Sequence, residues 1–422
     1  MSGDGATGGL TPHVTEDGVR RTLHLDQGQD ATLLHWACHD FTNKGDNYIA
    51  IITSVNVKFS KGGSEQQVSY VVKIKQVKDS GSTSDFDDMV FIKEGKFYTE
   101  IMPLINAELV NVGMTPLRVP CCLHSGWDEK QNELFLEDLQ PLGFKLHDRK
   151  KVMSTAHAVL VLQELARLHA ASFIVLSKTP QEDLIHKFKF LSWEMFNYSE
   201  KTKKAFDALI SGSLLTASEL AGAVDREDMK EWFRALSPRG PELLAEQMSG
   251  GSAFDVISHG DCWVNNLMFR YDAQSQPVEV MLVDFQLCRK SSLGVDLNYF
   301  LFSSLTAAER NVRLTDLLAT YYTAFQEVTE AAGIVAPYTL DDVIGEFHKK
   351  NIVGLIFGAL AIPALVCDPQ DGQEFDVTSD DHTNNYVTKK RQNTLTMLKT
   401  NSLVLPRLMN LYDDVELYAG LT

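Results

Sequence analysis

The spacing of apolar residues changes near Pro141, and this change constrains the fold more than any other feature of the chain. Before it, short runs rich in β-branched residues are separated by polar, turn-forming stretches, a pattern typical of strands. After it, apolar residues recur every three or four positions over long segments, as in amphipathic helices. We therefore predict an α+β protein of two lobes, with a small antiparallel sheet first and a large, mainly helical part second.

Three segments are expected along the chain. Residues 1–30 are rich in Gly, Thr and Asp and are predicted to form a flexible N-terminal segment. Residues 31–140 are predicted to form the sheet-rich lobe. Residues 141–422 are predicted to form the helical lobe, which short strands interrupt only between residues 254 and 288. The natural place for a ligand is the cleft between the two lobes.

Two predicted elements of the sheet-rich lobe carry polar residues of interest. A β-hairpin is expected from residues 47–59 and 68–77, which are β-branched runs around a polar stretch with two glycines. Alternation along its second strand places Lys73 on the face opposite Val72 and Ile74. The helix predicted next carries Glu94 on the same face as three apolar residues: Val90, Phe97 and Ile101.

The net charge of −17 and the isoelectric point near 5.1 argue against nucleic acid or an anionic membrane as the main partner. Any phosphate must be bound locally, by a lysine or a metal ion. Six cysteines without a Cys-x-x-Cys spacing indicate a reducing compartment, and no secretory signal is visible, so we expect a cytoplasmic protein. The apolar window Ile352–Cys367 is shorter than the ~18–20 residues that span a bilayer, so we predict a buried helix and no membrane span.

The stretch SHGDCWVNNLMF (258–269) places Asp261 and Asn266 in a loop between two apolar, strand-like runs, and Asp284 ends the next strand. Phosphoryl transfer uses this arrangement. The first aspartate orients an attacking hydroxyl, and the asparagine and second aspartate supply oxygen ligands to Mg²⁺. Asp and Asn also form ordinary turns, so the stretch by itself leaves both interpretations open.

Lys73 and Glu94 favour the catalytic interpretation. In kinases a strand lysine, held by a helix glutamate, reaches the phosphates of the nucleotide. Taken singly, each residue is explained more simply as a solvated charge. Together with Asp261, Asn266 and Asp284, they occur in the order along the chain that kinase chemistry requires.

Other candidate residues have simpler structural explanations. His259 is expected to organise its loop by hydrogen bonding, and His169 to be a core histidine with its hydrogen bonds satisfied. The spacing of Cys121, Cys122 and His124 suits no tetrahedral zinc site. The aromatic stretch FKFLSWEMFNY (188–198) is compatible with an apolar substrate pocket or with plain core packing.

Several segments of the chain resemble the ecdysteroid kinase-like family, which is related to choline kinases and aminoglycoside phosphotransferases. The tryptophan and double asparagine of the 259–269 stretch are specific to this group. The matching segments are KGDNYIAII (44–52), YVVKIK (70–75), FIKEGKFYTEIMP (91–103), LFLEDL (134–139), LARLHAASF (165–173), HGDCWVNNLMF (259–269) and VDFQLCRKSSLGVDLNYFL (283–301).

The resemblance implies a protein-kinase-like fold and ATP-dependent transfer of phosphate to a hydroxyl of a small molecule, such as an ecdysteroid, another steroid or a xenobiotic alcohol. It assigns Asp261 as the catalytic base and Asp296 as a brace for the loop. The same resemblance implies that Asn266 and Asp284 are the Mg²⁺ ligands and that Lys73 and Glu94 are the pair that holds the phosphates. It also implies that Gly45, Asp46 and Asn47 form the loop that covers the nucleotide, and that Glu137 and Leu139 belong to the hinge beside adenine.

The chain departs from protein kinases in three places. GDNY (45–48) is not a G-x-G-x-x-G loop, so fewer backbone N–H groups are available to phosphates. DFQ replaces D-F-G after Val283, and no A-P-E segment follows, which argues against a protein substrate. A second function remains open on the sequence alone: a non-catalytic protein that binds a nucleotide or a lipid on a kinase-like fold. The oligomeric state is also open.

Overall fold

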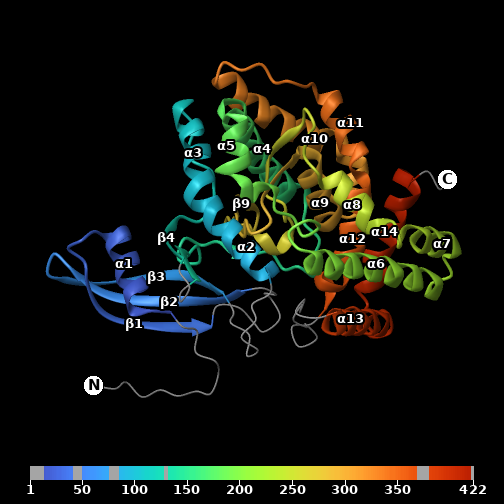
Figure 1. Ribbon diagram of the computed structural model, residues 1–422, viewed down its shortest axis with the longest axis horizontal. Helices are drawn as coiled ribbons and strands as arrows, with labels where there is room; N and C mark the ends of the chain where they lie inside the picture. Colours follow the sequence, from blue (N-terminus) through green and yellow to red (C-terminus); the bar gives the residue numbers. More distant parts are fainter. Residues whose placement is uncertain (1–13, 41–49, 76–84, 128–131, 368–379, 420–422) are drawn as a thin grey trace.

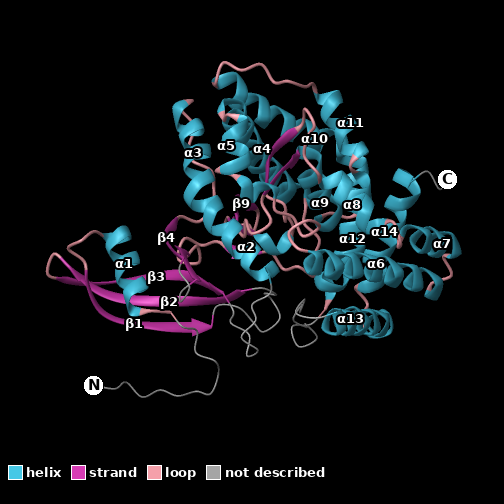
Figure 2. Ribbon diagram, in the orientation of Figure 1, coloured by secondary structure: helices cyan, strands magenta, loops and turns pink. Residues whose placement is uncertain are grey.

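The fold is taken from a computed structural model, in which residues 14–40, 50–75, 85–127, 132–367 and 380–419 are described. As predicted, the molecule has two lobes: strands β1 to β5 gather in one region, and helices make up most of the rest (Figures 1 and 2). A small antiparallel sheet followed by a mainly helical part is the arrangement of a protein-kinase-like fold.

The sheet of the first lobe is antiparallel, with the strand order β1-β2-β3-β5-β4. The β2–β3 hairpin confirms the prediction, although its turn is shorter than expected and consists of Gly62 and Gly63. Both glycines have positive φ angles, 59° and 81°, which side chains disfavour. The strands are β1 (Thr32–Asp40), β2 (Ala50–Lys61), β3 (Ser64–Lys75), β4 (Cys122–Trp127) and β5 (Asn132–Glu137).

An N-terminal helix, α1 (Glu16–Gln27), covers the outer face of this sheet (Figure 1). Its Val19 and Leu23 are fully buried in a small core with Val72 and Ile74 of β3. The prediction that residues 1–30 form a flexible segment was therefore wrong for residues 16–27. The apolar pair at four-residue spacing was the signal that the composition of the segment obscured.

The helix on the inner side of the sheet is interrupted by one π-helical turn. It consists of α2 (Asp85–Lys96), the π segment η1 (Phe97–Ile101) and α3 (Met102–Asn111). The prediction of a helix with a shared buried face is confirmed, because Val90, Glu94, Phe97 and Ile101 are all buried. The π turn was not predicted; such turns are rare and occur often at functional sites.

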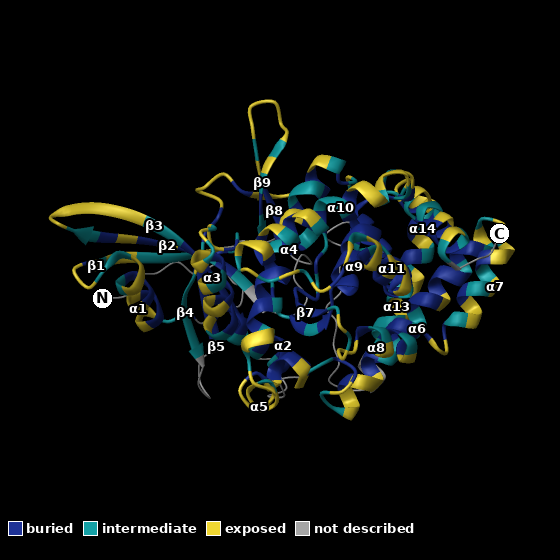
Figure 3. Ribbon diagram, turned by 90° about the horizontal axis from the view of Figure 1, so that it is seen from above, coloured by how far each residue is buried: buried dark blue, intermediate teal, exposed yellow. Residues whose placement is uncertain are grey.

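The second lobe is built around α4 (Thr155–Lys178), which packs against α10 (Ala307–Ala331). A single main core runs from Val71 and Leu134 on the inner face of the sheet into these helices, where buried residues concentrate (Figure 3). The other helices are α5 (Gln181–His186), the 3-10 turn η2 (Lys189–Ser192), α6 (Glu200–Ala223), α7 (Glu227–Leu236), α8 (Gly240–Met248), α9 (Leu293–Ser304), α11 (Leu340–Lys349), α12 (Asn351–Val366), α13 (Asp380–Thr400) and α14 (Val404–Ala419).

Short strands between the helices form two further sheets. The order in the first is β6-β8-β9, and in the second β10 pairs with β7. The strands predicted within residues 254–288 are present, whereas β6 and β10 lack the apolar runs on which a sequence prediction depends. The bounds are β6 (Lys145–Leu146), β7 (Asp255–Ser258), β8 (Leu267–Tyr271), β9 (Pro277–Leu282) and β10 (Arg289–Ser292).

Length and composition alone would let α4 cross a membrane, and α11 with α12 would pass the same test as a pair bent by 52°. The most apolar window of α4 is 67% buried, as in the core helix of a globular domain. The window predicted to be a buried helix is α12, most of whose residues are buried. The aromatic stretch 188–198 includes Phe188, Phe190 and Phe196, which lie in the main core.

We expect the substitution Leu23→Ala to lower the free energy of unfolding by about 2–5 kcal/mol, because Leu23 is 0% exposed under the sheet. The matched control on the same helix is Leu25→Ala: Leu25 is 64% exposed, and a change within about 0.5 kcal/mol is expected. Urea denaturation of both variants checks this. Equal, small effects would show that α1 does not stabilise the lobe.

Candidate active site

The β8–β9 hairpin brings two predicted site residues to the same end of one sheet. Asn266 immediately precedes β8, and Asp284 lies two residues beyond the end of β9. The strands pair with Leu267 opposite Leu282, and the Val283 N–H donates to the Asn266 carbonyl at 3.1 Å. Residues distant in sequence are thus held side by side by backbone hydrogen bonds.

The carboxylate of Asp261 is held at both oxygens. Its Oδ2 accepts from Asn266 Nδ2 at 2.8 Å, and its Oδ1 accepts from the Tyr299 hydroxyl at 2.8 Å. Tyr299 stacks on Phe357 of α12 with ring centroids 4.2 Å apart. Sequence reasoning missed Tyr299. The available signal was its position three residues after Asp296, almost one turn further along the same helix, α9.

Asp296, at the start of α9, anchors the loop that carries Asp261. Its carboxylate accepts from the backbone N–H groups of His259 at 2.6 Å and Gly260 at 2.9 Å. Burial alone would raise the pKa of Asp296, but hydrogen bonds, above all the one with His169, hold it below the usual value. His169 contacts Asp296 and Tyr321 with its two ring nitrogens, so it is a core histidine with both nitrogens satisfied, as predicted.

His259 fixes the shape of the same loop. Its Nε2 lies 3.1 Å from the Val283 carbonyl, and its Nδ1 lies 3.3 Å from the Asp261 backbone N–H. One nitrogen therefore donates and the other accepts, which is the pattern of a neutral imidazole. Burial lowers the pKa of His259, in agreement with a neutral ring. The expected organising role of His259 matches these contacts.

Lys73 joins the two lobes at the centre of the site. Its Nζ donates to both carboxylate oxygens of Glu94, at 2.7 and 2.8 Å, and to Asp284 Oδ1 at 2.8 Å. Asp284 has a φ angle of +71°, an uncommon conformation outside glycine, and its other oxygen accepts from Gln286 Nε2 at 3.2 Å. The structure thus brings together five of the predicted site residues: Lys73, Glu94, Asp261, Asn266 and Asp284.

The buried site carries more negative than positive charge. Burial raises the pKa of Asp261 to about 7, with a further contribution from the charge of Asp284. Burial also raises the pKa of Glu94 to about 7, although Lys73 opposes it. Burial would lower the pKa of Lys73, but Asp284 and Glu94 outweigh burial and raise it. Glu94 and Asp284 share one ammonium, and the charge of Asp284 also acts on Asp261, so the cluster favours the approach of another cation.

Phe285, next to Asp284, connects the site to the interrupted helix. Its ring stacks on that of Phe97, with the ring centroids 4.1 Å apart and 9° between the planes. The ring of His259 also lies close to it, with a centroid distance of 4.5 Å. Tyr98 meets the same ring edge-on at 5.9 Å. Because Phe97 and Tyr98 open the π turn, the turn lets two consecutive aromatic rings reach Phe285.

The predicted hinge lies at the end of β5. The backbone N–H of Glu137 already donates to the Cys121 carbonyl at 2.8 Å. Leu139 is buried and packs with Phe144 and Met268 in a small apolar cluster under the hinge. Sequence reasoning missed Met268, although it follows Asn266 by two positions on β8. The predicted loop residues Gly45, Asp46 and Asn47 lie outside the described residues.

A magnesium ion fits the donors that the site offers. Asp284 and Asn266 supply a carboxylate and an amide oxygen, and Oδ1 of Asn266 accepts no hydrogen bond from the described residues. Mg²⁺ prefers such hard oxygens and completes its octahedron with water and substrate phosphates. Within the described parts of the chain, no three His, Cys, Asp or Glu side chains form a metal site on their own, so a cation here would need those additional ligands.

This fold and this cluster of residues are typical of the kinase-like class of proteins. The sequence profile of the ecdysteroid kinase-like family matches residues 44–334. The chain belongs to that family. No curated protein sequence matches the chain significantly.

The chain is also similar to solved structures, among them an ethanolamine kinase, an aminoglycoside phosphotransferase and a choline kinase. The chain is similar to an ethanolamine kinase from Plasmodium vivax, with 11% identity, a TM-score of 0.40, and 91% of this chain and 90% of that chain covered. It is similar to a GDP complex of aminoglycoside 2'-phosphotransferase-IIIa, with 12% identity, a TM-score of 0.39 and coverages of 97% and 100%. It is also similar to the choline kinase LicA from Streptococcus pneumoniae, with 12% identity, a TM-score of 0.34, and 90% of this chain and 99% of that chain covered.

We expect Gly260→Ala to destabilise the protein more than Gly143→Ala, which replaces a glycine of similar φ that has space for a side chain. Gly260 has φ +82°, and a Cβ there would lie 2.0 Å from the Leu287 carbonyl oxygen. The overlap adds about 1–3 kcal/mol to the strain of the backbone angle. The matched control is Gly143→Ala, where φ is +86° but a Cβ makes only ordinary contacts. Thermal unfolding of both variants would contradict this expectation if their midpoints fell equally.

Proposed function

We propose that this protein is an ATP-dependent kinase that phosphorylates a hydroxyl group of a small molecule. The observation that carries the proposal is the position of Lys73, which contacts Glu94 and Asp284 at once. Asp261 and Asn266, hydrogen-bonded to each other, belong to the same buried site. Membership of the ecdysteroid kinase-like family supports the same function.

The residues divide the work of phosphoryl transfer between them. Asp284 and Asn266 would hold Mg²⁺, which when bound neutralises charge on the nucleotide phosphates. Lys73, oriented by Glu94, places a positive charge against the phosphates. Asp261 orients the acceptor hydroxyl and takes its proton as the oxygen bonds to the γ-phosphorus and the bond to the bridging oxygen of ADP breaks.

Two contacts support Asp261 as the group that faces the acceptor. Hydrogen bonds from Tyr299 and Asn266 fix both carboxylate oxygens, so the side chain has one defined orientation. Asp296 fixes the backbone on the N-terminal side of the same residue. A positioned base contributes typically ~10²–10⁴ in rate.

The end of β5 supports adenine binding by residues 137–139. The Glu137 N–H is bonded to Cys121, whereas the Leu139 N–H donates to none of the described residues. Leu139 and Met268 offer an apolar surface for a flat ring. Adenine would thus be held by the Leu139 backbone and these two side chains.

The acceptor is inferred to be an apolar alcohol such as an ecdysteroid, another steroid or a xenobiotic. Tyr299 beside Asp261 is stacked on Phe357, and α12 is apolar along its whole length. Apolar side chains therefore border the catalytic aspartate, which favours a hydrophobic acceptor over a charged one. We further infer that the protein acts in the cytoplasm, because all six cysteines are free thiols.

The roles of the two aspartates are separable. Asp261→Asn and Asp284→Asn should both abolish turnover in an ATP-consumption assay. Only Asp284→Asn should greatly weaken nucleotide binding in the presence of Mg²⁺, because of the two aspartates Asp284 alone would be a ligand of the cation. Asp272→Asn, at the turn of the same β8–β9 hairpin, is the control and should bind normally. Equal losses of nucleotide affinity in both site variants would contradict the assignment.

Ligand-induced stabilisation distinguishes the kinase from a non-catalytic binding protein. Mg-ATP at ~100 times its dissociation constant should stabilise the fold by about 2.7 kcal/mol, seen as a higher unfolding temperature. When alcohols of the steroid, choline and glycoside classes are added with Mg-ATP, the enzyme should release ADP at rates that differ between the classes. Stabilisation by a steroid, with no effect of Mg-ATP and no ADP release, would favour a lipid sensor.

A further inference from the structure

Two buried cations flank the active site, one on the helix that carries Glu94 and one on the strand that follows Asp284. Lys93 lies on α2 next to Glu94, and Arg289 opens β10, five residues after Asp284. Both are 0% exposed. Both face the same carboxylate, that of Glu194, with Arg289 Nη1 at 3.2 Å and Lys93 Nζ at 3.9 Å.

This outer group repeats the inner one with the charges reversed. In the inner group, Lys73 stands between the carboxylates of Glu94 and Asp284. In the outer group, the carboxylate of Glu194 stands between two cations, Lys93 on α2 and Arg289 on β10. We call Lys93, Glu194 and Arg289 the outer bracket. It involves none of the groups that would touch a substrate.

The turn that presents Glu194 is itself held in place. The backbone N–H of Glu194 donates to Asn197 Oδ1 at 2.9 Å, and the Asn197 N–H donates to the Glu194 carbonyl at 3.0 Å. Lys93 adds a second contact to this turn, since its Nζ donates to the Trp193 carbonyl at 2.6 Å. The carboxylate is therefore a fixed point against which α2 can be placed.

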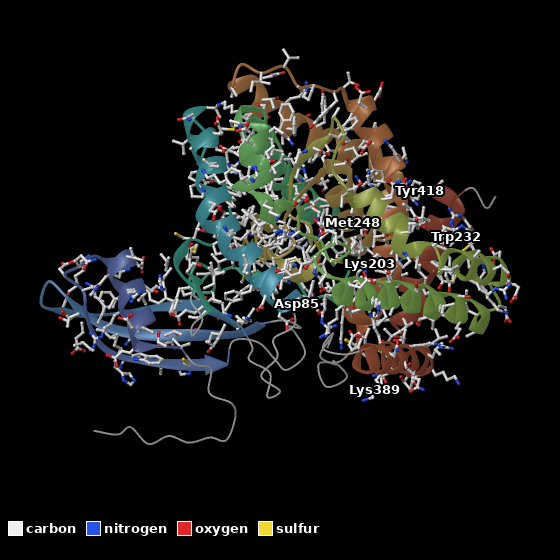
Figure 4. The ribbon with its side chains drawn as sticks, in the orientation of Figure 1. Asp85, Lys203, Trp232, Met248, Lys389 and Tyr418 are labelled. Atoms are coloured by element: carbon white, nitrogen blue, oxygen red, sulfur yellow. The ribbon has the colours of Figure 1, made fainter. Side chains whose placement is uncertain are left out.

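Arg289 extends the bracket to the catalytic loop. Its Nε donates to the Leu287 carbonyl at 3.1 Å, and its Nη1 approaches Met248 Sδ at 3.6 Å (Met248 is labelled in Figure 4). A Cβ on Gly260 would lie 3.2 Å from this Nε, so the guanidinium packs directly below the residue before Asp261. Buried cations of this kind depend strongly on their partner, because loss of one member leaves an uncompensated charge.

The inner contact cannot persist unchanged when a nucleotide binds. An ammonium has three donors, and Lys73 uses them on two oxygens of Glu94 and one of Asp284. A phosphate must replace one of these acceptors. If Asp284 turns to the cation, the ion pair that links α2 to Asp284 through Lys73 is lost, and the outer bracket and the stacking of Phe97 on Phe285 still join the two segments.

We propose that Glu194 is a positioning residue that keeps α2 and the segment after Asp284 at a fixed separation, through Lys93 and Arg289, while a nucleotide occupies the site. The inference rests on the proposed function only in taking Lys73 and Asp284 as the groups that a nucleotide and its cation engage. The outer bracket itself is a property of the protein without ligand.

Amide hydrogen exchange of the full chain without ligand tests the outer bracket directly. In Glu194→Gln, exchange in residues 85–101 and 284–292 should become at least ~10-fold faster, because local opening of these segments is easier. Asp414→Asn is the control, since it removes the partner of another buried arginine, Arg310, away from the site. It should leave exchange in these segments unchanged. If Glu194→Gln also leaves exchange in residues 85–101 and 284–292 unchanged, the proposal is wrong.

A double-variant cycle separates a shared contact from two independent defects. Lys93→Met and Glu194→Gln should each speed exchange in α2, and the double variant should exchange no faster than the worse single variant. Multiplied effects would overturn the shared contact.

Nucleotide binding then tests the consequence for the site. Glu194→Gln should raise the Kd for Mg-ADP and lower kcat, by about 10- to 100-fold for a displacement near 1 Å, without changing the KM of the acceptor. A lower unfolding temperature with unchanged Kd and kcat would make Glu194 merely structural. If the unsubstituted protein binds no nucleotide, the proposed kinase function fails, and the exchange experiments still decide whether the bracket exists.

Discussion

The site depends first on a single buried carboxylate, that of Asp296. It accepts the backbone N–H groups on both sides of the His259–Gly260 bond, and His169 holds it from below. Because Asp296 begins α9 and Tyr299 lies on the same helix, one rigid element fixes both the loop backbone and the side chain of Asp261. The geometry of the loop is therefore inherited from the core of the helical lobe rather than from the loop itself.

Charge is distributed in layers around this anchor. The inner layer has three carboxylates and one lysine, and the outer layer has two cations and one glutamate. Each layer alone is unbalanced, and together they are closer to neutral. With a net charge of −17 the protein has no basic surface to attract phosphates, so binding them at this site depends on Lys73 and on an added cation.

The sequence supported the lobes, the β2–β3 hairpin and the pairing of Lys73 with Glu94, because these follow from local periodicity and the order of residues along the chain. Tyr299, Met268 and the outer bracket could not be found in that way. Lys93 and Arg289 look like surface charges in a one-dimensional pattern, and only the packing of segment 188–198 between them reveals their burial. The π turn likewise depends on tertiary contacts with Phe285.

That π turn gives the helix of α2, η1 and α3 two differently oriented ends. The α3 end belongs mechanically to the helical lobe, since it packs on α4 and Glu108 receives an ion pair from Lys178. The α2 end contacts the sheet through Glu94 and Lys73, and it contacts the helical lobe through Lys93, whose Nζ donates to the Trp193 carbonyl. The backbone hydrogen bonding changes register between Phe97 and Ile101, at the point where the helix passes from α2 to α3. The same turn presents Phe97 and Tyr98 to Phe285, so one short segment sets both the course of the helix and the packing beside Asp284.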